Sequence, residues 1–409
     1  MSNICNLLKL LCRPALAGGT DLLESYQRAF VEIIVGKGPL PSLAFWRGRV
    51  ALWTLLKAAG VASEDDEVIL PAYTCEMVPT AVRFTSGRCV FVDVERGGLN
   101  PSVQQIANAV SERTRAIVIQ HTYGMVQSVR ELKSLLAGRR VTLIEDCCQF
   151  VANSYFQDNT AVSDAAFFST QWSKPFSTGL GGMAVFFNND LYNASRKLLA
   201  TFPTERNRKR ARSLAAQVLL HKLTVHPRTE ALIARIYRWM QRAGLVQGTT
   251  SPEEYSDNMP SDYLEGAVNV QAVLGILELS KWEENISHRR MLTKYYLSSL
   301  SEMGVNISHL KPGSDKFALW AIPLFVENAD EIRGRAAKAG LPVARWFMRP
   351  PIHLTPSAAE RYNYRMGQCP VSEWMVSREI HLLTTPSVTL RRAEAAVNLI
   401  KKYARRTNC

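Results

Sequence analysis

Short apolar segments alternate with helical segments along the first half of the chain. The apolar segments are rich in Val, Ile and Phe and cover residues 67–71, 89–94, 115–121, 141–146, 165–170 and 183–187. Helical segments are predicted between most of them, near residues 45–60, 76–86, 101–112 and 128–138. This alternation predicts an α/β fold with a mostly parallel, doubly wound sheet. In such a sheet, ligands bind at the carboxyl ends of the strands.

The pattern changes after about residue 260. A long helix is predicted over 263–300, then an apolar strand at 317–326, a helix near 328–340 and a helical stretch at 390–406. The chain has 409 residues and is 47% hydrophobic, so it can bury one large core and a smaller one. We therefore predict an N-terminal arm (1–30), a large domain (31–260), and a linking helix with a small C-terminal α+β domain (261–409).

Neither a membrane span nor a disulfide framework is indicated. No apolar stretch reaches 18 residues, and the short apolar run near the N-terminus is interrupted by Lys9 and has no basic residue before it. The eight Cys include no C-x-x-C pair, and Cys147 and Cys148 are adjacent in or near a predicted core strand. We expect a cytoplasmic chain with reduced, buried thiols and without a metal site.

Asp146 and Lys174 stand where a ligand of the predicted sheet would bind. Asp146 ends the apolar run at 141–146, and Lys174 follows the next apolar segment in a Gly-rich stretch. Pyridoxal phosphate chemistry uses this pair of groups, because a Lys amine holds the aldehyde and a carboxylate pairs with the pyridinium nitrogen. Two ordinary alternatives stand beside this interpretation: Asp146 could cap the next helix, and Lys174 could be a solvated loop cation.

Six short motifs place the pair in a longer pattern. In chain order they are Gly48-Arg-Val-Ala-Leu52, Asp66-Glu-Val-Ile-Leu-Pro71-Ala-Tyr-Thr-Cys75, Val90-Phe-Val-Asp93-Val, Arg113-Thr-Arg-Ala-Ile-Val-Ile-Gln-His121-Thr-Tyr-Gly124, Ile144-Glu-Asp146-Cys-Cys-Gln149, and Phe168-Ser169 five residues before Lys174. Together they resemble the DegT/DnrJ/EryC1/StrS family of sugar aminotransferases, from about Phe45 to Asp190 and more faintly from about Ala267 onward. The resemblance implies the PLP-transferase fold of type I.

The resemblance also implies roles for three of these residues. Lys174 would hold the cofactor and act as the general acid and base of the reaction. Some relatives carry His at this position and are dehydratases, so the Lys favours amino transfer. Asp146 would bind the pyridine nitrogen, and Gln149 resembles the family residue beside the cofactor's ring oxygen.

For the cofactor phosphate, the resemblance points to Ser169 and to the turn of Gly48, Arg49 and Val50. A helix N-terminus presents free N–H groups and a positive dipole end, which suits a dianion. Many relatives have a small hydroxyl residue at Arg49, so this guanidinium either adds a charge to the site or points to solvent. Relatives also have a G-Y-N-Y-R-M-like stretch that contributes a partner-subunit residue, but residues 262–266 of this chain do not match it.

Cys75 departs from the family pattern, because many relatives have there an aromatic residue that stacks on the cofactor ring. Either the thiol covers that face, or the ring of His121 or Tyr123 does. His353 follows Arg349-Pro-Pro-Ile and resembles a family segment near the substrate entrance, although a structural His fits equally well. We assign His121, Tyr123 and His353 to the substrate side of the site.

The net charge of +13 is concentrated in one stretch. Residues 205–242 carry ten Lys or Arg against Glu205 and Glu230, a net of +8. Four of them, Arg228, Arg235, Arg238 and Arg242, share one helical face, and Leu232, Ile236, Trp239 and Met240 share another. The stretch is either a helical insertion with a solvated basic side, or a surface for a nucleotide diphosphate or an anionic membrane. Nucleic acid is not expected, because no recognition motif is present.

The sequence as a whole predicts a pyridoxal 5′-phosphate-dependent aminotransferase. By resemblance, its substrate is a nucleotide-linked keto sugar, its amino donor is glutamate, its setting is surface polysaccharide or amino-sugar synthesis, and its assembly is a homodimer. The chain would be cytoplasmic, with peripheral contact to the inner face of the membrane through residues 205–242. Two alternatives remain: an enzyme of the same fold that acts on a non-sugar ketone or an amino acid, and an inactive relative that binds membranes or nucleic acid.

Overall fold

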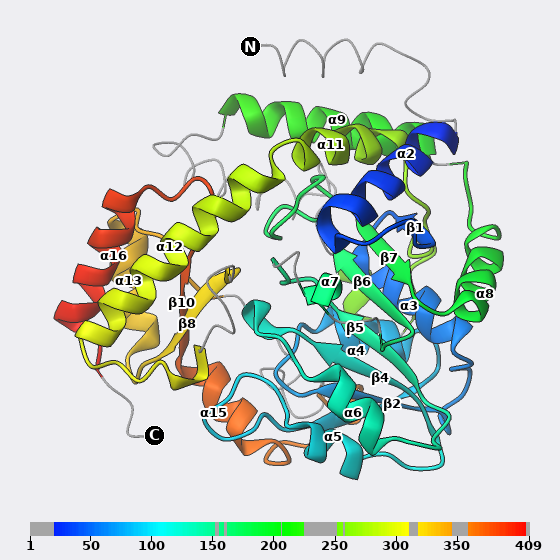
Figure 1. Ribbon diagram of the computed structural model, residues 1–409, viewed down its shortest axis with the longest axis horizontal. Helices are drawn as coiled ribbons and strands as arrows, with labels where there is room; N and C mark the ends of the chain where they lie inside the picture. Colours follow the sequence, from blue (N-terminus) through cyan, green and yellow to red (C-terminus); the bar gives the residue numbers. More distant parts are fainter. Residues whose placement is uncertain are drawn as a thin grey trace.

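A seven-stranded sheet forms the centre of the large domain. The computed structural model describes residues 20–151, 155–158, 162–205, 207–224, 252–256, 258–310, 318–345 and 359–405. The strands are β1 (Ser42–Phe45), β2 (Glu67–Pro71), β3 (Arg88–Val92), β4 (Thr114–Gln120), β5 (Thr142–Asp146), β6 (Ala165–Ser169) and β7 (Gly182–Phe186). Their order is β1-β7-β6-β5-β4-β2-β3 (Figure 1). Strands β2 to β6 pair in parallel and β1 and β7 pair antiparallel, which confirms the mostly parallel sheet.

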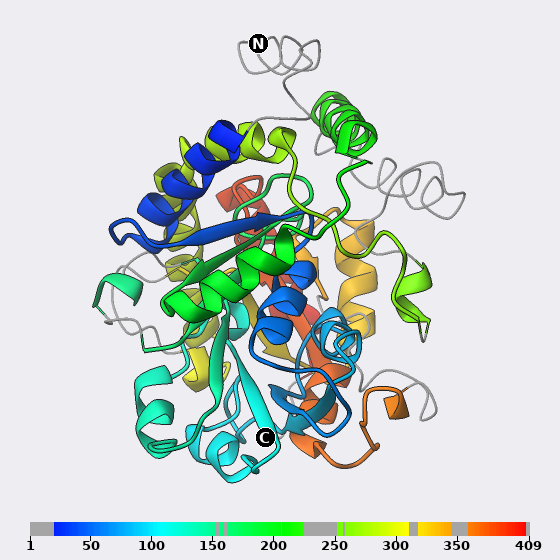
Figure 2. The same cartoon turned by 90° about the vertical axis from the view of Figure 1, so that its right-hand side faces the viewer.

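Helices cover both faces of this sheet. Its helical elements are α2 (Thr20–Phe30), η2 (Val31–Val35), α3 (Gly48–Ala58), α4 (Met77–Arg83), α5 (Val103–Asn108), η3 (Thr122–Gly124), α6 (Val129–Leu135), α7 (Tyr155–Asp158), α8 (Asn189–Leu199), α9 (Asn207–Thr224) and η4 (Pro252–Tyr255). Figure 2 shows the blue α3 and the green α8 in front of the sheet.

Alternation along the strands explains the two layers. In β4, Ala116 and Val118 belong to the core under α3 and α4, whereas Ile117 and Ile119 belong to the core under α5 and α6. Successive side chains of a strand point to opposite faces, so each face of a doubly wound sheet needs its own apolar set. This requirement is why the predicted strands read as continuous apolar runs.

The small domain is built on a three-stranded antiparallel sheet. The strands are β8 (Ala321–Phe325), β10 (Glu379–Leu383) and β9 (Val343–Ala344), in the order β8-β10-β9. Its helical elements are η5 (Ser308–Leu310), α13 (Ala329–Lys338), α15 (Pro370–Arg378) and α16 (Leu390–Tyr403). The α+β character of the C-terminal region agrees with the expectation from its sequence.

The predicted single helix over 263–300 is wrong, because two helices occupy this stretch. They are α11 (Asn269–Leu279) and α12 (Trp282–Glu302), separated at Ser280 and Lys281. Helix α11 packs against α2, where Gly275 meets the Tyr26 ring, while α12 runs on toward the small domain (Figure 1). Trp282, the first residue of α12, is buried in the core that the two domains share. A break without Gly or Pro leaves little signal in the sequence.

Only part of the basic stretch is described. Helix α9 buries Ala211, Leu214, Ala215 and Val218 in a core that includes residues of α11. The four arginines from Arg228 to Arg242 and the apolar face with Leu232 and Trp239 lie outside the described residues, as does most of the N-terminal arm. In the described part of the chain, no helix is long and apolar enough to cross a membrane.

Candidate active site

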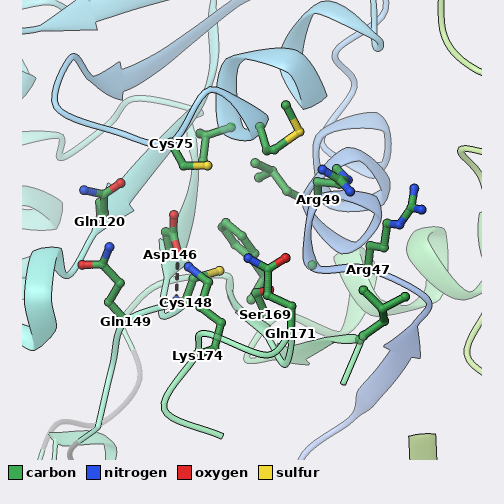
Figure 3. Close-up of a pocket in the computed structure, with 17 residues that line it drawn as sticks. Arg47, Arg49, Cys75, Gln120, Asp146, Cys148, Gln149, Ser169, Gln171 and Lys174 are labelled. Carbon is green, nitrogen blue, oxygen red and sulfur yellow. Dashed lines mark hydrogen bonds between the residues drawn. The ribbon is translucent and has the colours of Figure 1, made fainter. Parts of the chain in front are cut away.

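A cavity lies at the carboxyl end of the sheet. It is bounded by the start of α3, the ends of β4, β5 and β6, and the loop between β6 and β7 (Figure 3). Seven of the predicted site residues line it: Gly48, Arg49, Cys75, Asp146, Gln149, Ser169 and Lys174. Its position is that expected for a ligand site in an open α/β sheet.

Asp146 is the last residue of β5 and is 5% exposed. Its Oδ1 accepts a hydrogen bond of 2.9 Å from the backbone N–H of Cys148, which fixes the direction of the carboxylate (Figure 3). Burial raises the pKa of Asp146, and the Cys148 N–H and the nearby Lys174 act in the opposite direction. A buried carboxylate is stabilised by a cationic partner, and a protonated pyridine nitrogen is such a partner.

Lys174 lies in the loop between β6 and β7 and is 8% exposed. Its backbone N–H donates to the Gln171 carbonyl oxygen at 2.9 Å, so the residue sits in a tight turn. Its Nζ lies 5.9 Å from the centre of the Trp320 ring. Burial on the cavity wall beside an acid excludes the solvated loop cation that was the ordinary alternative for this Lys.

Gln149 offers a donor that the described structure leaves unused. Its Oε1 accepts a hydrogen bond from the backbone N–H of Tyr123. Its Nε2 is buried and, among the described residues, has no hydrogen-bond partner. A buried donor without a partner is costly, so a ligand acceptor at this point of the cavity would stabilise it. The ring oxygen of pyridoxal phosphate is an acceptor of this kind, and the residue therefore fits the cofactor.

The start of α3 lies unusually close to the sheet. A Cβ at Gly48 would stand 2.8 Å from Cβ of Ser169, and a Cβ at Gly182 would stand 2.6 Å from N of Gly48. The two glycines thus let the helix N-terminus and the Ser169 side chain meet at one end of the cavity, which is a favourable place for a dianion. Val50 is different, because its N–H donates to the Arg47 carbonyl oxygen and its side chain is fully buried in the core.

Arg49 neither points to solvent nor stands alone. Its Nη1 lies 2.8 Å from Oε2 of Glu254, and Nη1 of Arg47 lies 2.8 Å from Oε1 of the same carboxylate. All three side chains are buried. Burial and the neighbouring Arg49 lower the pKa of Arg47, and Glu254 acts against this. Two guanidinium groups and one carboxylate leave a net charge of +1 beside the helix N-terminus.

The two cysteines of the cavity are protonated thiols at neutral pH. Burial raises the pKa of Cys75 and raises that of Cys148 well above its ordinary value. Figure 3 shows Cys75 on the opposite side of the cavity from Lys174. At this place the cavity wall is an apolar thiol and not an aromatic ring, and its contact with a cofactor ring stays a prediction.

The structure does not bring His121 and Tyr123 to the cavity wall. His121 is fully buried, with Nε2 2.8 Å from Oε2 of Glu145, and its Nδ1 accepts the Gln127 N–H. Nε2 therefore carries the proton, and the imidazole is bound to Glu145 by a hydrogen bond. Tyr123 donates its hydroxyl proton to Glu379 at 2.7 Å. Their substrate roles stay predictions, as does that of His353, which lies outside the described residues.

Sequence reasoning missed four polar or thiol residues of the cavity wall: Arg47, Gln120, Cys148 and Gln171. Gln120 is the last residue of β4 and pairs in register with Asp146. Because side chains alternate along a strand, Gln120 faces the cavity and His121 does not. The register between β4 and β5 would have identified Gln120, but the register cannot be read from the two segments separately.

Comparison with known proteins gives a consistent result. Residues 28–221 and 229–401 match the DegT/DnrJ/EryC1/StrS aminotransferase family. GDP-perosamine synthase of Escherichia coli O157:H7 is 24% identical over 347 residues, which are 84% of this chain and 80% of that protein. L-glutamine:2-deoxy-scyllo-inosose aminotransferase of Streptomyces lividus is 32% identical over 169 residues, which are 41% of this chain and 39% of that one.

The fold is shared with solved structures. The crystal structure of ntda from Bacillus subtilis with bound cofactor pmp has a TM-score of 0.71 at 18% identity, over 98% of this chain and 82% of that chain. Since the family match extends over most of the sequence, this chain belongs to the DegT/DnrJ/EryC1/StrS aminotransferase family, which confirms the predicted family, fold and enzyme class.

Proposed function

We propose that the chain is a pyridoxal-phosphate-dependent aminotransferase that moves an amino group from glutamate to a nucleotide-linked keto sugar. One observation carries the cofactor assignment: Asp146, Lys174 and the unsatisfied Gln149 amide line one cavity whose far end is the N-terminus of α3. Asp146 would match a pyridine nitrogen, Lys174 an aldehyde, Gln149 a ring oxygen and the α3 N-terminus a phosphate.

Each residue then has a defined task. Asp146 would hold a proton on the pyridine nitrogen, and Gln149 would donate to the ring oxygen. The α3 N-terminus and Ser169 would bind the phosphate, with Arg47 and Arg49 adding positive charge. Lys174 would hold the cofactor and would carry a proton on Nζ to and from the reacting carbon. When bound, the cofactor supplies an electron sink that stabilises negative charge at that carbon.

The substrate class is proposed from the family and from the relatives' names. GDP-perosamine synthase is matched over most of both chains, which favours a nucleotide-linked sugar. The aminotransferase of Streptomyces lividus is named for L-glutamine and for 2-deoxy-scyllo-inosose, a name that contains no nucleotide. A ketone without a nucleotide, with glutamine as donor, is therefore the second candidate.

A substrate screen separates the two candidates. Purified protein is incubated with GDP-, dTDP- and UDP-linked keto sugars or with free cyclic ketones, each with glutamate or glutamine, and the aminated product is identified by mass spectrometry. We expect amination of a nucleotide-linked sugar with glutamate. Turnover only of free ketones would contradict the proposed substrate class, and turnover only with glutamine would contradict the proposed donor.

The basic stretch allows a separate electrostatic prediction. Replacing Arg228, Arg235, Arg238 and Arg242 by Gln removes four charges. If the stretch serves an anionic partner, binding either to anionic vesicles or to the nucleotide sugar should weaken, and the wild-type interaction should fade with added salt. A control variant removes four exposed charges of the small domain, at Lys338, Arg391, Lys401 and Lys402. Unchanged binding to both partners would show a solvated helical insertion.

Assembly and location belong to the same proposal. We propose a homodimer, because sugar aminotransferases of this family complete the cofactor site across the subunit interface. Peripheral attachment to an anionic membrane depends on the same four arginines and is decided by the vesicle measurement.

A further inference from the structure

The two peptide carbonyls that flank Lys174 are both held from outside their own loop. The indole Nε1 of Trp320 donates to the Ser173 carbonyl oxygen at 2.9 Å. The amide Nδ2 of Asn285 donates to the Pro175 carbonyl oxygen at 3.0 Å. Asn285 lies on α12 and Trp320 lies directly before β8, so both donors come from the C-terminal part of the chain. The residue that would hold the cofactor is therefore fixed on each side by one side chain of that part.

Arg289 joins the two donors. Its Nε donates to Oδ1 of Asn285 at 2.8 Å, and its Nη1 lies 3.3 Å from the Trp320 carbonyl oxygen and 3.1 Å from Oγ1 of Thr384. Because Oδ1 of Asn285 accepts from Arg289, Nδ2 must face Pro175, which settles the orientation of this amide. Hydrogen bonds from a charged donor are stronger than neutral ones, so Arg289 holds both donors firmly.

Hydrogen bonds, and no counter-charge among the described residues, compensate the burial of Arg289. The side chain is 2% exposed, and within the described ranges no carboxylate lies at ion-pair distance from it. Burial lowers the pKa of Arg289 to about 10, so the group is still charged at neutral pH. A buried charge without a counter-charge is costly, and an apolar residue could fill the same space. An arginine at position 289 is therefore better explained by its hydrogen bonds to Asn285 and Trp320 than by a gain in stability.

Trp320 also contacts Tyr123 of the large domain. Its ring stacks on Tyr123 with centroids 5.8 Å apart, and its backbone N–H donates to the Tyr123 carbonyl oxygen at 3.0 Å. The Lys174 amine lies 5.9 Å from the same ring, within the range of a cation–π interaction. The indole thus touches both the backbone before Lys174 and the surroundings of its amine.

We propose that Arg289, Asn285 and Trp320 form a positioning network that sets the direction of the Lys174 side chain. The proposal rests on the proposed function only for the task of Lys174. None of the three residues lines the cavity, so they act through the Ser173 and Pro175 carbonyls rather than on a bound molecule. Because Trp320 directly precedes β8, the network also makes the position of the Lys174 amine depend on the position of the small domain.

The test uses two mild variants and two matched controls. Asn285→Ala removes the donor to Pro175, and Trp320→Phe removes the donor to Ser173 while keeping a ring against Tyr123. Ser298→Ala lies on the same helix and loses only a surface bond to Glu302. Trp374→Phe loses an indole whose ring contacts are Phe325 and Arg378. Arg289→Met is made as well, and its melting temperature shows whether it folds.

Three readouts are measured in each variant. The first is hydrogen–deuterium exchange of residues 171–178 in the cofactor-free chain, the second is the rate of covalent capture of pyridoxal phosphate, and the third is the affinity for pyridoxamine phosphate, which needs no covalent bond. In Asn285→Ala and Trp320→Phe, we expect about fivefold faster exchange and about fivefold slower capture, the effect of one lost hydrogen bond. Pyridoxamine phosphate affinity should stay within about twofold of wild type, and both controls should behave as wild type.

Two results would overturn the network. One is wild-type exchange and capture in both mild variants, and the other is a loss of pyridoxamine phosphate affinity as large as the loss of capture rate, which indicates general damage to the cavity. A failure of the proposed function looks different, because wild-type protein would then capture no pyridoxal phosphate. The exchange measurement would still decide whether the three residues hold the loop.

Discussion

Lys174→Ala should abolish amino transfer while leaving the fold intact. The amine would serve both as the attachment point of the cofactor and as the proton carrier, and acid–base catalysis by a placed group is worth about 10²–10⁴-fold. We therefore expect kcat/KM to fall by at least about 10³-fold. The loss should be mainly in kcat, because binding of the phosphate and the nucleotide does not depend on this amine.

Two controls make this result specific. Lys197→Ala removes an exposed Lys of α8 and should keep wild-type turnover. Circular dichroism and melting of Lys174→Ala should resemble wild type, since a truncated side chain at the cavity wall opens no core. Turnover of Lys174→Ala within about tenfold of wild type would mean that another group carries the proton.

Asp146→Asn should be the second most damaging change. Asn can still accept the Cys148 N–H, so the local turn is kept, but it cannot act as an anion opposite the pyridine nitrogen. The nitrogen would lose its proton, and the cofactor would lose much of its capacity to accept electrons. By analogy with the removal of one partner of a buried ion pair, we expect a loss of about 3–5 kcal/mol, shared between cofactor affinity and kcat.

Asp146→Asn should not lower the stability of the cofactor-free chain, although it lowers activity. Burial raises the pKa of Asp146 above its value in the unfolded chain, so the folded state gains stability when this carboxyl is protonated and loses it as the pH rises through the folded pKa. When ionised, this buried carboxylate is thus a cost without its cationic partner. Cofactor-free Asp146→Asn should melt no lower than wild type at pH 7, with exposed Asp190→Asn as the control. A clearly lower melting point would show that Asp146 has a structural role.

Local sequence patterns predicted the parts of the site that depend on strand ends. Asp146 and Ser169 are the last residues of their strands, and Lys174 follows in the next loop, so a correct reading of two apolar runs placed all three on one edge. The short β1 was missed, because its four residues form a strand only through antiparallel pairing with β7. The prediction of a helix N-terminus at Gly48 agrees with the observed start of α3.

Contacts between distant segments could not be predicted. Glu254 lies 207 positions from Arg47, and nothing near either residue signals their ion pair. Trp320 and Asn285 reach the Lys174 loop across 147 and 110 positions. His121 was assigned to the site, but its neighbour Gln120 lines the cavity instead. Neighbouring residues at a strand end point to opposite faces, so a shift of one residue changes which side chain reaches the cavity. Tertiary packing decides which distant residues meet and which side chain of a strand end faces the cavity, and neither can be read from a local sequence pattern.

Lys174 should be the residue that binds the cofactor covalently. Protein incubated with pyridoxal phosphate is reduced with borohydride, digested and analysed by peptide mass spectrometry, with Lys174→Ala treated in parallel. We expect a visible absorption band before reduction, a single modified peptide that contains Lys174, and no stable modification in Lys174→Ala. Reduced cofactor on a different Lys of the wild-type protein, with Lys174 unmodified, would contradict it.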